Sequence, residues 1–98
     1  MKRVLIECRD LFFRGKLRAI LTASGAEPAR EEPYDLAVIE LGQPGTSQRI
    51  TDLVARGIPV LAFGSHVDAA ALRAARELGA RAVPNSEIET ALRHATRS

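Results

Sequence analysis

The most constraining feature of this sequence is a regular alternation of short apolar runs with stretches of helical periodicity. The apolar runs cover residues 4–6, 36–39, 58–63 and 81–83. Runs that are apolar on both faces are typical of strands buried in a parallel sheet. Because a helical stretch follows each run, the strands must be joined by right-handed crossovers. The sequence therefore predicts an α/β fold: a three-layer open parallel sheet of four to five strands with helices on both faces.

Residue types at the ends of the helical stretches predict where the helices begin and end. Asp10 can accept hydrogen bonds from the free amides of a first turn, and Gly25 ends that helix. The next helix is short, with Thr46 or Ser47 as its cap and Gly57 at its end.

Two further helices have signals that resemble capping boxes. Ser65 is followed three residues later by Asp68, before a helix that we expect to reach about residue 78. Ser86 and Glu89 form the same pattern before the last helix. Between these helices, Pro84 ends the last strand.

Residues 26–34 fit neither a helix nor a long strand. They contain two prolines and several charged residues. At most, residues 26–29 form a short edge strand, and we expect the remainder to be a loop.

Length and charge narrow the classes of function. Ninety-eight residues form one domain, spanning 1–98. A net charge of +2 is too small to indicate nucleic-acid binding. The single cysteine, Cys8, excludes an internal disulfide, and no apolar run is long enough for a membrane span or a signal peptide. We expect a soluble, cytoplasmic chain that binds neither nucleic acid nor membranes.

Glu40 is the most informative polar residue in the predicted sheet. It lies at the carboxyl end of the expected central strand, residues 35–41, just before Gly42. In open α/β sheets, ligands and chemistry collect at this edge. Glu7 is expected at the same edge, after the first strand.

The order of the elements and several local strings resemble the receiver domain of two-component response regulators. The matching strings are Val4-Leu5-Ile6, Tyr34-Asp35-Leu36, Pro44-Gly45, Ile58-Pro59-Val60-Leu61 and Gly79-Ala80. The resemblance implies the flavodoxin-like strand order 2-1-3-4-5. It also implies a truncated receiver, because residues 26–34 are too few to hold both a second strand and the second helix.

Receiver chemistry requires a phosphate-accepting Asp, an acidic pair that holds Mg²⁺, a hydroxyl that binds the phosphoryl group, and a Lys. The resemblance places the phosphoacceptor at Glu40, the acidic pair at Glu7 and Cys8, the hydroxyl at Gly64 beside Ser65, and the lysine at Pro84 or Asn85. None of the required residues is kept.

These substitutions argue against phosphoryl transfer. The extra methylene of Glu40 moves its carboxylate about 1.5 Å outward, and positioning is nearly all of this catalysis. A thiol at Cys8 is a poor ligand for Mg²⁺. The resemblance therefore implies a pseudo-receiver: a non-enzymatic protein–protein interaction module of bacterial signal transduction that needs no cofactor and no metal.

Other interpretations of the same edge stay open. Glu40 can mimic a phosphorylated aspartate. Glu7, Asp10 and Glu40 can gather a divalent cation, although Arg9 or Asn85 can satisfy one carboxylate instead.

The turn after the fourth strand offers two more alternatives. Ser65, His66 and Glu40 can form a nucleophilic set, although Ser65 is better explained as a helix cap. A small-ligand-binding domain can use a pocket at the strand ends, lined by Glu7, Glu40, Gly64 and His66. Cys8 is interpreted as a small buried residue rather than a redox centre.

Basic residues accumulate in the last third of the chain. They are Arg73, Arg76, Arg81, Arg93, His94 and Arg97. In receivers, the fourth helix, fifth strand and fifth helix form the usual partner and dimer face. The resemblance thus implies another signalling protein or a second copy of this chain as the partner, and His66 can belong to such a surface. A solvated, arginine-rich exterior is the alternative.

Overall fold

Five parallel strands form one sheet in the order β2-β1-β3-β4-β5. The computed structural model describes residues 1–97. Its strands are β1 (Arg3–Glu7), β2 (Glu27–Pro28), β3 (Leu36–Glu40), β4 (Val60–Gly64) and β5 (Arg81–Pro84). The predicted fold class and the flavodoxin-like strand order are both confirmed.

The register of the central strands brings their carboxyl ends to one edge. β1 lies beside β3 with Val4 opposite Leu36, and β3 lies beside β4 with Ala37 opposite Val60. β3 is buried along Leu36–Ile39, as expected for a strand covered on both faces. The last residue of each strand therefore lies near the end of its neighbour.

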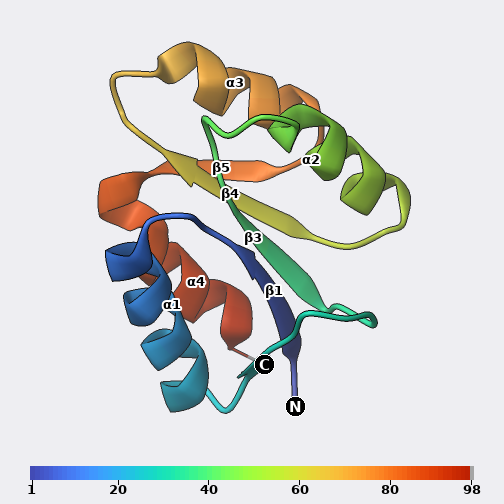
Figure 1. Cartoon of the computed structure of the whole chain (residues 1–98), viewed down its shortest axis with the longest axis vertical. Coiled ribbons are helices and arrows are strands. Elements are labelled where there is room, and N and C mark those ends of the chain that lie inside the picture. The colour runs from blue at the N-terminus through green and yellow to red at the C-terminus, as the bar shows by residue number, and fades with distance from the viewer. Residues whose placement is uncertain (98) are drawn as a thin grey trace.

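Four α-helices cover the two faces of the sheet. They are α1 (Leu11–Ala23), α2 (Thr46–Ala55), α3 (Ala69–Glu77) and α4 (Ile88–Thr96), and a 3₁₀ turn at Asn85–Glu87 precedes α4. Figure 1 shows α1 and α4 together on one face and α2 and α3 on the other. Within residues 1–97, no helix has the length and apolar character needed to cross a membrane.

Each face of the sheet has its own apolar core. Leu17 of α1 and Leu92 of α4 pack with Phe63 of β4 in one core. Leu53 of α2 packs with Ile39 of β3 in the other. Side chains that alternate along the strands thus supply both cores, and this burial drives the formation of the three layers.

The structure confirms the predicted N-terminal cap of α1, but the predicted cap of α2 is wrong. Asp10 Oδ1 accepts hydrogen bonds from the main-chain N–H groups of Phe12 and Phe13, at 2.9 and 3.1 Å. The residue that caps α2 is Gly45, with φ of +78° and no side-chain hydrogen bond. Thr46 is already helical, and its hydroxyl donates to the carbonyl of Gln43.

Both predicted capping boxes are also wrong. Asp68 is itself the cap of α3 and accepts from the N–H of Ala71, so Ser65 lies outside the helix. The residue before α4 is Glu87, which makes no side-chain cap bond. Ser86 lies inside the preceding 3₁₀ turn, and that turn takes the place of a side-chain cap.

Residues 29–35 connect β2 to β3 without a helix. β2 has two residues, within the predicted limits of 26–29. Arg3 holds the connection: its guanidinium donates to the carbonyls of Glu31 and Pro33 and pairs with Glu27. The absence of a second helix from this segment, implied by the receiver resemblance, is confirmed.

Candidate functional site

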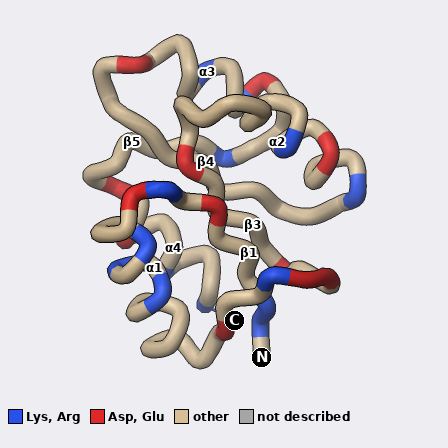
Figure 2. Tube along the Cα trace, in the orientation of Figure 1, with Lys and Arg blue, Asp and Glu red and all other residues tan. Residues whose placement is uncertain are grey.

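The residues that the sequence places at one edge of the sheet do lie there. Glu7 ends β1 opposite Ile39, and Glu40 ends β3 opposite Phe63. Gly64 ends β4 opposite Pro84 of β5. Figure 2 shows acidic and basic positions alternating along the loop that follows β1 at this edge. We therefore treat this edge as the candidate site.

Glu40 is anchored by the main chain of the loop after β1. Its Oε1 accepts a hydrogen bond from the N–H of Arg9 at 2.8 Å. The expectation that Arg9 satisfies this carboxylate is confirmed, through the main chain rather than the guanidinium. The hydrogen bond that the structure gives to the Glu40 side chain comes from Arg9 and not from Asn85. The carboxylate thus ties the end of β3 to the β1–α1 loop.

Glu7 is paired with a cation that sequence reasoning missed. Arg49 Nε of α2 lies 3.0 Å from Glu7 Oε2. Nothing in the local sequence around Arg49 signals this contact, because it joins residues 42 positions apart. The pair neutralises one of the carboxylates that the sequence assigns to the site.

Cys8 is buried, with 5% of its surface exposed. Its Sγ donates to the carbonyl oxygen of Asp10 at 3.3 Å. Burial raises the pKa of the Cys8 thiol above its ordinary value, and the negative charge of Glu40 raises it further. The thiol is therefore held neutral, which suits the predicted buried structural residue better than a metal ligand or a nucleophile.

The three carboxylates at this edge do not converge on a cation. Glu7 pairs with Arg49, Asp10 caps α1, and Glu40 accepts from the main chain. Among residues 1–97 no cluster of three or more His, Cys, Asp and Glu has a metal-binding arrangement. Among the described residues, Glu7, Asp10 and Glu40 thus do not have the common arrangement that a divalent site on these carboxylates would need.

The turn after β4 does not form a nucleophilic set. Ser65 Oγ accepts from the N–H of Val67 at 3.3 Å, and His66 is exposed. In the described part of the chain, no hydrogen bond joins Ser65 or His66 to Glu40. Ser65 shapes the turn, so its predicted role as a helix cap is wrong as well.

Gly64 is closely packed by Leu41, the residue that follows β3. A Cβ at this position would lie 3.2 Å from the Cβ of Leu41, so a larger residue would displace that side chain. The cavity at Gly64 is small, about 160 Å³, and Leu41, Ser65 and Asp68 contribute to its lining. Neither Glu7, Glu40 nor His66 lines it, so the predicted ligand pocket at the strand ends is not formed as expected.

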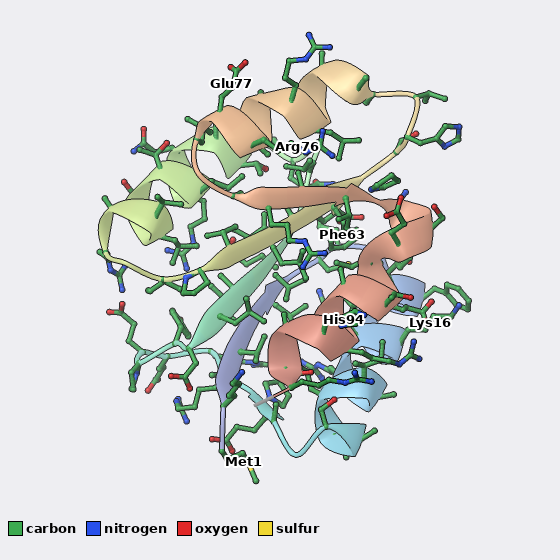
Figure 3. All side chains as sticks on the ribbon, turned by 180° about the vertical axis from the view of Figure 1, so that it is seen from behind. Met1, Lys16, Phe63, Arg76, Glu77 and His94 are labelled. Atoms are coloured by element: carbon green, nitrogen blue, oxygen red, sulfur yellow. The ribbon has the colours of Figure 1, made fainter. Side chains whose placement is uncertain are left out.

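The basic residues of the last third of the chain do not form one surface. The guanidinium of Arg76 donates twice to the carbonyl oxygen of Ala82, at 3.2 and 2.8 Å, and so ties α3 to β5. Figure 3 shows Arg76 beside β5, which runs between α3 and α4. Arg73 and Arg81 are exposed. These two arginines remain available to solvent or to a partner on the α3–β5 side.

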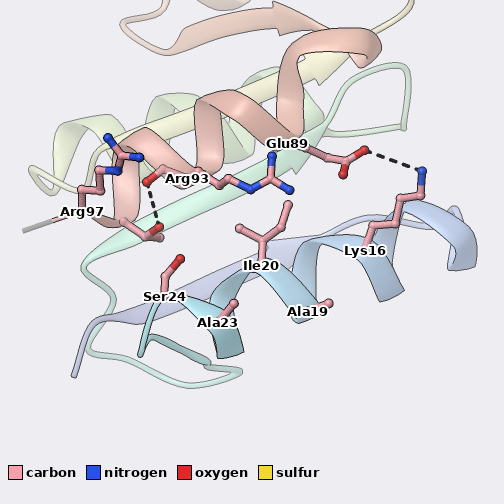
Figure 4. Close-up of a pocket in the computed structure, with 9 residues that line it drawn as sticks. Lys16, Ala19, Ile20, Ala23, Ser24, Glu89, Arg93 and Arg97 are labelled. Carbon is pink, nitrogen blue, oxygen red and sulfur yellow. Dashed lines mark hydrogen bonds and ion pairs between the residues drawn. The ribbon is translucent and has the colours of Figure 1, made fainter.

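Arg93 and Arg97 belong instead to a groove between α1 and α4. The groove has a volume of about 600 Å³, and its lining includes both arginines, Ile20 and Ser24 (Figure 4). Lys16 of α1 pairs with Glu89 of α4 across it at 3.6 Å. This part of the predicted basic surface therefore faces α1 and not β5.

Exposed apolar residues near the candidate site were missed by sequence reasoning. Leu11 and Phe12 open α1 with exposed fractions of 74% and 69%, and Val67 follows β4 with 79%. The ammonium of Lys16 lies 4.4 Å from the centre of the Phe12 ring. The signal was available in the helical spacing, since Phe13 and Leu17 face inward and leave Phe12 outside.

Comparisons with known proteins identify the fold. No family model and no curated protein sequence matches the chain. An orphan response regulator of H. pylori superposes with a TM-score of 0.77 at 15% identity, covering 98% of this chain and 97% of that one. The NtrC4 receiver domain, solved as a beryllofluoride-activated dimer, gives a TM-score of 0.77 at 19% identity over 98% and 97% of the two chains. A CheY-like protein of Pseudomonas aeruginosa gives 0.73 at 19% identity over 97% and 99%.

Proposed function

We propose that this chain, which has the fold of a response-regulator receiver domain, is a pseudo-receiver. In this proposal it acts in the bacterial cytoplasm as a protein–protein interaction module of signal transduction and does not undergo phosphoryl transfer. The observation that carries the proposal is the state of the carboxyl edge of the sheet. There, the side chains at the positions of receiver chemistry are occupied by contacts within the protein.

A metal site is the first requirement that the edge does not meet. Phosphoryl transfer depends on a divalent cation that neutralises charge on the transferred group. Arg49 already neutralises Glu7, and the Cys8 thiol keeps its proton. A neutral thiol and a paired carboxylate form a poor site for Mg²⁺, which requires several oxygen ligands.

A free phosphoacceptor carboxylate is the second requirement that the edge does not meet. Glu40 is longer than aspartate, and its carboxylate is held by the N–H of Arg9. An in-line attack requires a carboxylate oxygen that is free and correctly placed. We propose that Glu40 instead fixes the β1–α1 loop in one conformation, which is the structural form that a phosphomimic role would take here.

A hydroxyl and a cation that recognise the phosphoryl group are the third requirement that the edge does not meet. Gly64 offers no hydroxyl, and Leu41 fills the space beside it. Pro84 and Asn85 supply no cation at the end of β5. Gly64, Pro84 and Asn85 therefore supply neither the hydroxyl nor the ammonium group that would stabilise an acyl phosphate at this edge.

An interaction role is supported by the surface. Leu11 and Phe12 at the start of α1 and Val67 in the loop after β4 are exposed apolar side chains near the candidate edge, where contact with a partner would remove them from water. For a partner protein or a second copy of this chain, we propose the α3–β5–α4 face, where Arg73 and Arg81 are exposed.

Binding experiments with surface variants test the interaction role. The chain, immobilised, is exposed to an extract of its native cell, and bound proteins are quantified by mass spectrometry. We expect a signalling protein to bind the wild type but not the variant Arg73→Glu/Arg81→Glu. Thr51→Glu, an exposed change on α2, is the control and should retain the binding. Sedimentation of the purified variants tests the homodimer in the same way. Equal behaviour of the two variants in both experiments would contradict the proposed face.

A second experiment tests the inert site directly. Beryllofluoride with Mg²⁺ imitates a phosphoryl group on a carboxylate. We expect the amide NMR signals of residues 7–10, 40 and 64–66 to be unchanged by its addition. Shifts confined to these signals would show that the site still accepts a phosphoryl group.

A further inference from the structure

A further cavity lies beside β1 at the edge of the sheet where β2 ends. It has a volume of about 450 Å³ and lies between α1, the end of β2 and β1. The residues that line it are Leu5, Ile6, Arg14, Arg18, Pro28, Ala29 and Arg30. Three of the seven are arginines and none is acidic. We refer to it as the arginine pocket.

The pocket exists because the sheet edge is incomplete. β1 runs from Arg3 to Glu7, but β2 pairs only with Arg3 and Val4. The connection from β2 to β3 contains no helix that would cover the remaining part of β1. Ile6, which packs on the α1 side of the sheet, therefore forms an apolar floor beside an open strand edge. The side chain of Leu5 points to the opposite face, into the core under α2.

Contacts outside the pocket hold two of its arginines in place. Arg14 donates from Nε and Nη2 to the carbonyl oxygen of Cys8, at 3.0 and 2.8 Å, which leaves Nη1 available. The main-chain carbonyl of Arg30 accepts from the hydroxyl of Tyr34 at 2.9 Å. Ala29 is fixed to the sheet by its N–H, which donates to the carbonyl of Val4 at 2.8 Å.

The charges of the pocket are not neutralised. In the part of the chain that the structure describes, the ion pairs involve Arg3, Lys16, Arg49 and Arg56, but not Arg14, Arg18 or Arg30. Three guanidinium groups around one cavity repel one another unless an anion lies between them. Guanidinium groups also match the geometry of phosphate oxygens and can donate to them in pairs.

We propose that the arginine pocket binds a small organic phosphate with two or more negative charges, of the size of a nucleoside diphosphate. Its phosphates would lie among the arginines, and its apolar part would lie on Ile6. The volume is within the range of small-molecule sites, which favours a small ligand over a protein segment. Such a ligand would bind apart from the Glu40 edge, so the pocket adds to the proposed function and does not depend on it.

Titration calorimetry with named probes tests this site. The probes are ADP, GDP and inorganic pyrophosphate, in low salt and without Mg²⁺, so that no metal-dependent binding contributes. We expect saturable binding with one ligand per chain, weakened by added salt. Tighter binding of a nucleotide than of pyrophosphate would show that the apolar floor holds the nucleoside. Equal binding would show that the phosphates alone are recognised, and both results support the pocket.

A charge-matched pair of variants makes the test specific. Arg18→Ala/Arg30→Ala removes two exposed pocket arginines whose side chains make no ion pair in residues 1–97, so the fold is retained. Arg93→Ala/Arg97→Ala removes the same charge from exposed positions in the groove between α1 and α4. We expect the first pair to weaken binding about tenfold or more and the second to leave it unchanged. Absence of saturable binding to the wild type, or equal weakening by both pairs, would overturn the proposal.

Discussion

At the scale of single residues, Cys8 and Glu40 show how the candidate site is held. The thiol is buried, and the Glu40 carboxylate near it accepts a hydrogen bond from Arg9. Both the burial and the neighbouring negative charge oppose ionisation of the thiol. The region that carries chemistry in receivers is here organised around a neutral sulfur and an anchored carboxylate.

This arrangement predicts a pH dependence of stability. The pKa of the Cys8 thiol is raised in the folded chain above its ordinary value of 9.0. As pH rises through that value, the unfolded chain loses the proton while the folded chain keeps it. The folded state then binds more protons, so the free energy of unfolding falls. Below this range the thiol contributes no pH dependence.

Urea unfolding at a series of pH values measures this effect. Cys8→Ala removes the titrating group, and we expect its free energy of unfolding to fall less steeply than that of the wild type above pH 9.0. Identical pH profiles for the two proteins would show that the thiol titrates alike in both states.

At the scale of elements, the junctions between helices and strands determine the local geometry. α2 and α3 are each followed, two residues after their last residue, by a glycine with positive φ: Gly57 at +76° and Gly79 at +103°. The two glycines differ in their surroundings. A Cβ on Gly79 would lie 2.9 Å from Val54 Cγ1, whereas a Cβ on Gly57 would meet nothing within 4 Å.

Alanine at these two positions separates backbone strain from packing. Gly57→Ala adds strain alone and is expected to cost about 1–2 kcal/mol. Gly79→Ala adds a collision with α2 and is expected to cost more, about 2–3 kcal/mol. Denaturant unfolding measures both. In a double-mutant cycle, Val54→Ala should relieve part of the cost of Gly79→Ala; strict additivity would mean that the collision is not the cause.

Arg3 replaces, in part, the stabilisation that a second helix would give to residues 29–35. Its guanidinium reaches two carbonyls of this connection, and its main-chain N–H donates to Asp35 at 2.7 Å. We expect Arg3→Ala to increase amide hydrogen exchange and proteolytic cleavage within residues 29–35, while Arg81→Ala does neither. Arg3→Lys should behave like Arg3→Ala, because an ammonium cannot replace the planar fork. Unchanged exchange in Arg3→Ala would show that other contacts hold the connection.

The same elements show what could be predicted from sequence. Apolar runs located four of the strands, and Asp10 located the start of α1, because these signals depend on nearby residues. The caps of α2, α3 and α4 were misassigned, since several hydroxyl and carboxylate residues compete within each turn and the backbone conformation selects among them. Gly45 caps α2 through its positive φ, a property that no neighbouring side chain indicates.

At the scale of the whole molecule, the fold was predictable and the site only in part. Alternating strands and helices form a parallel sheet, in which the carboxyl ends of all strands lie at the same edge. Glu7, Glu40 and Gly64 are therefore brought to this edge whatever the conformation of the loops. The contacts of those residues were not predictable, because Arg49 reaches Glu7 from a distant helix. The arginine pocket likewise depends on the early end of β2, which leaves part of β1 uncovered.

The central claim is that a receiver fold persists here without phosphoryl transfer. Intact-mass spectrometry after incubation with acetyl phosphate and Mg²⁺ tests it most directly, with an active receiver domain as the positive control. We predict that the mass of this chain stays unchanged, because a protonated Cys8 and a paired Glu7 are poor ligands for Mg²⁺ and Glu40 is anchored. Stoichiometric addition of one phosphoryl group, abolished by Glu40→Gln, would contradict the account.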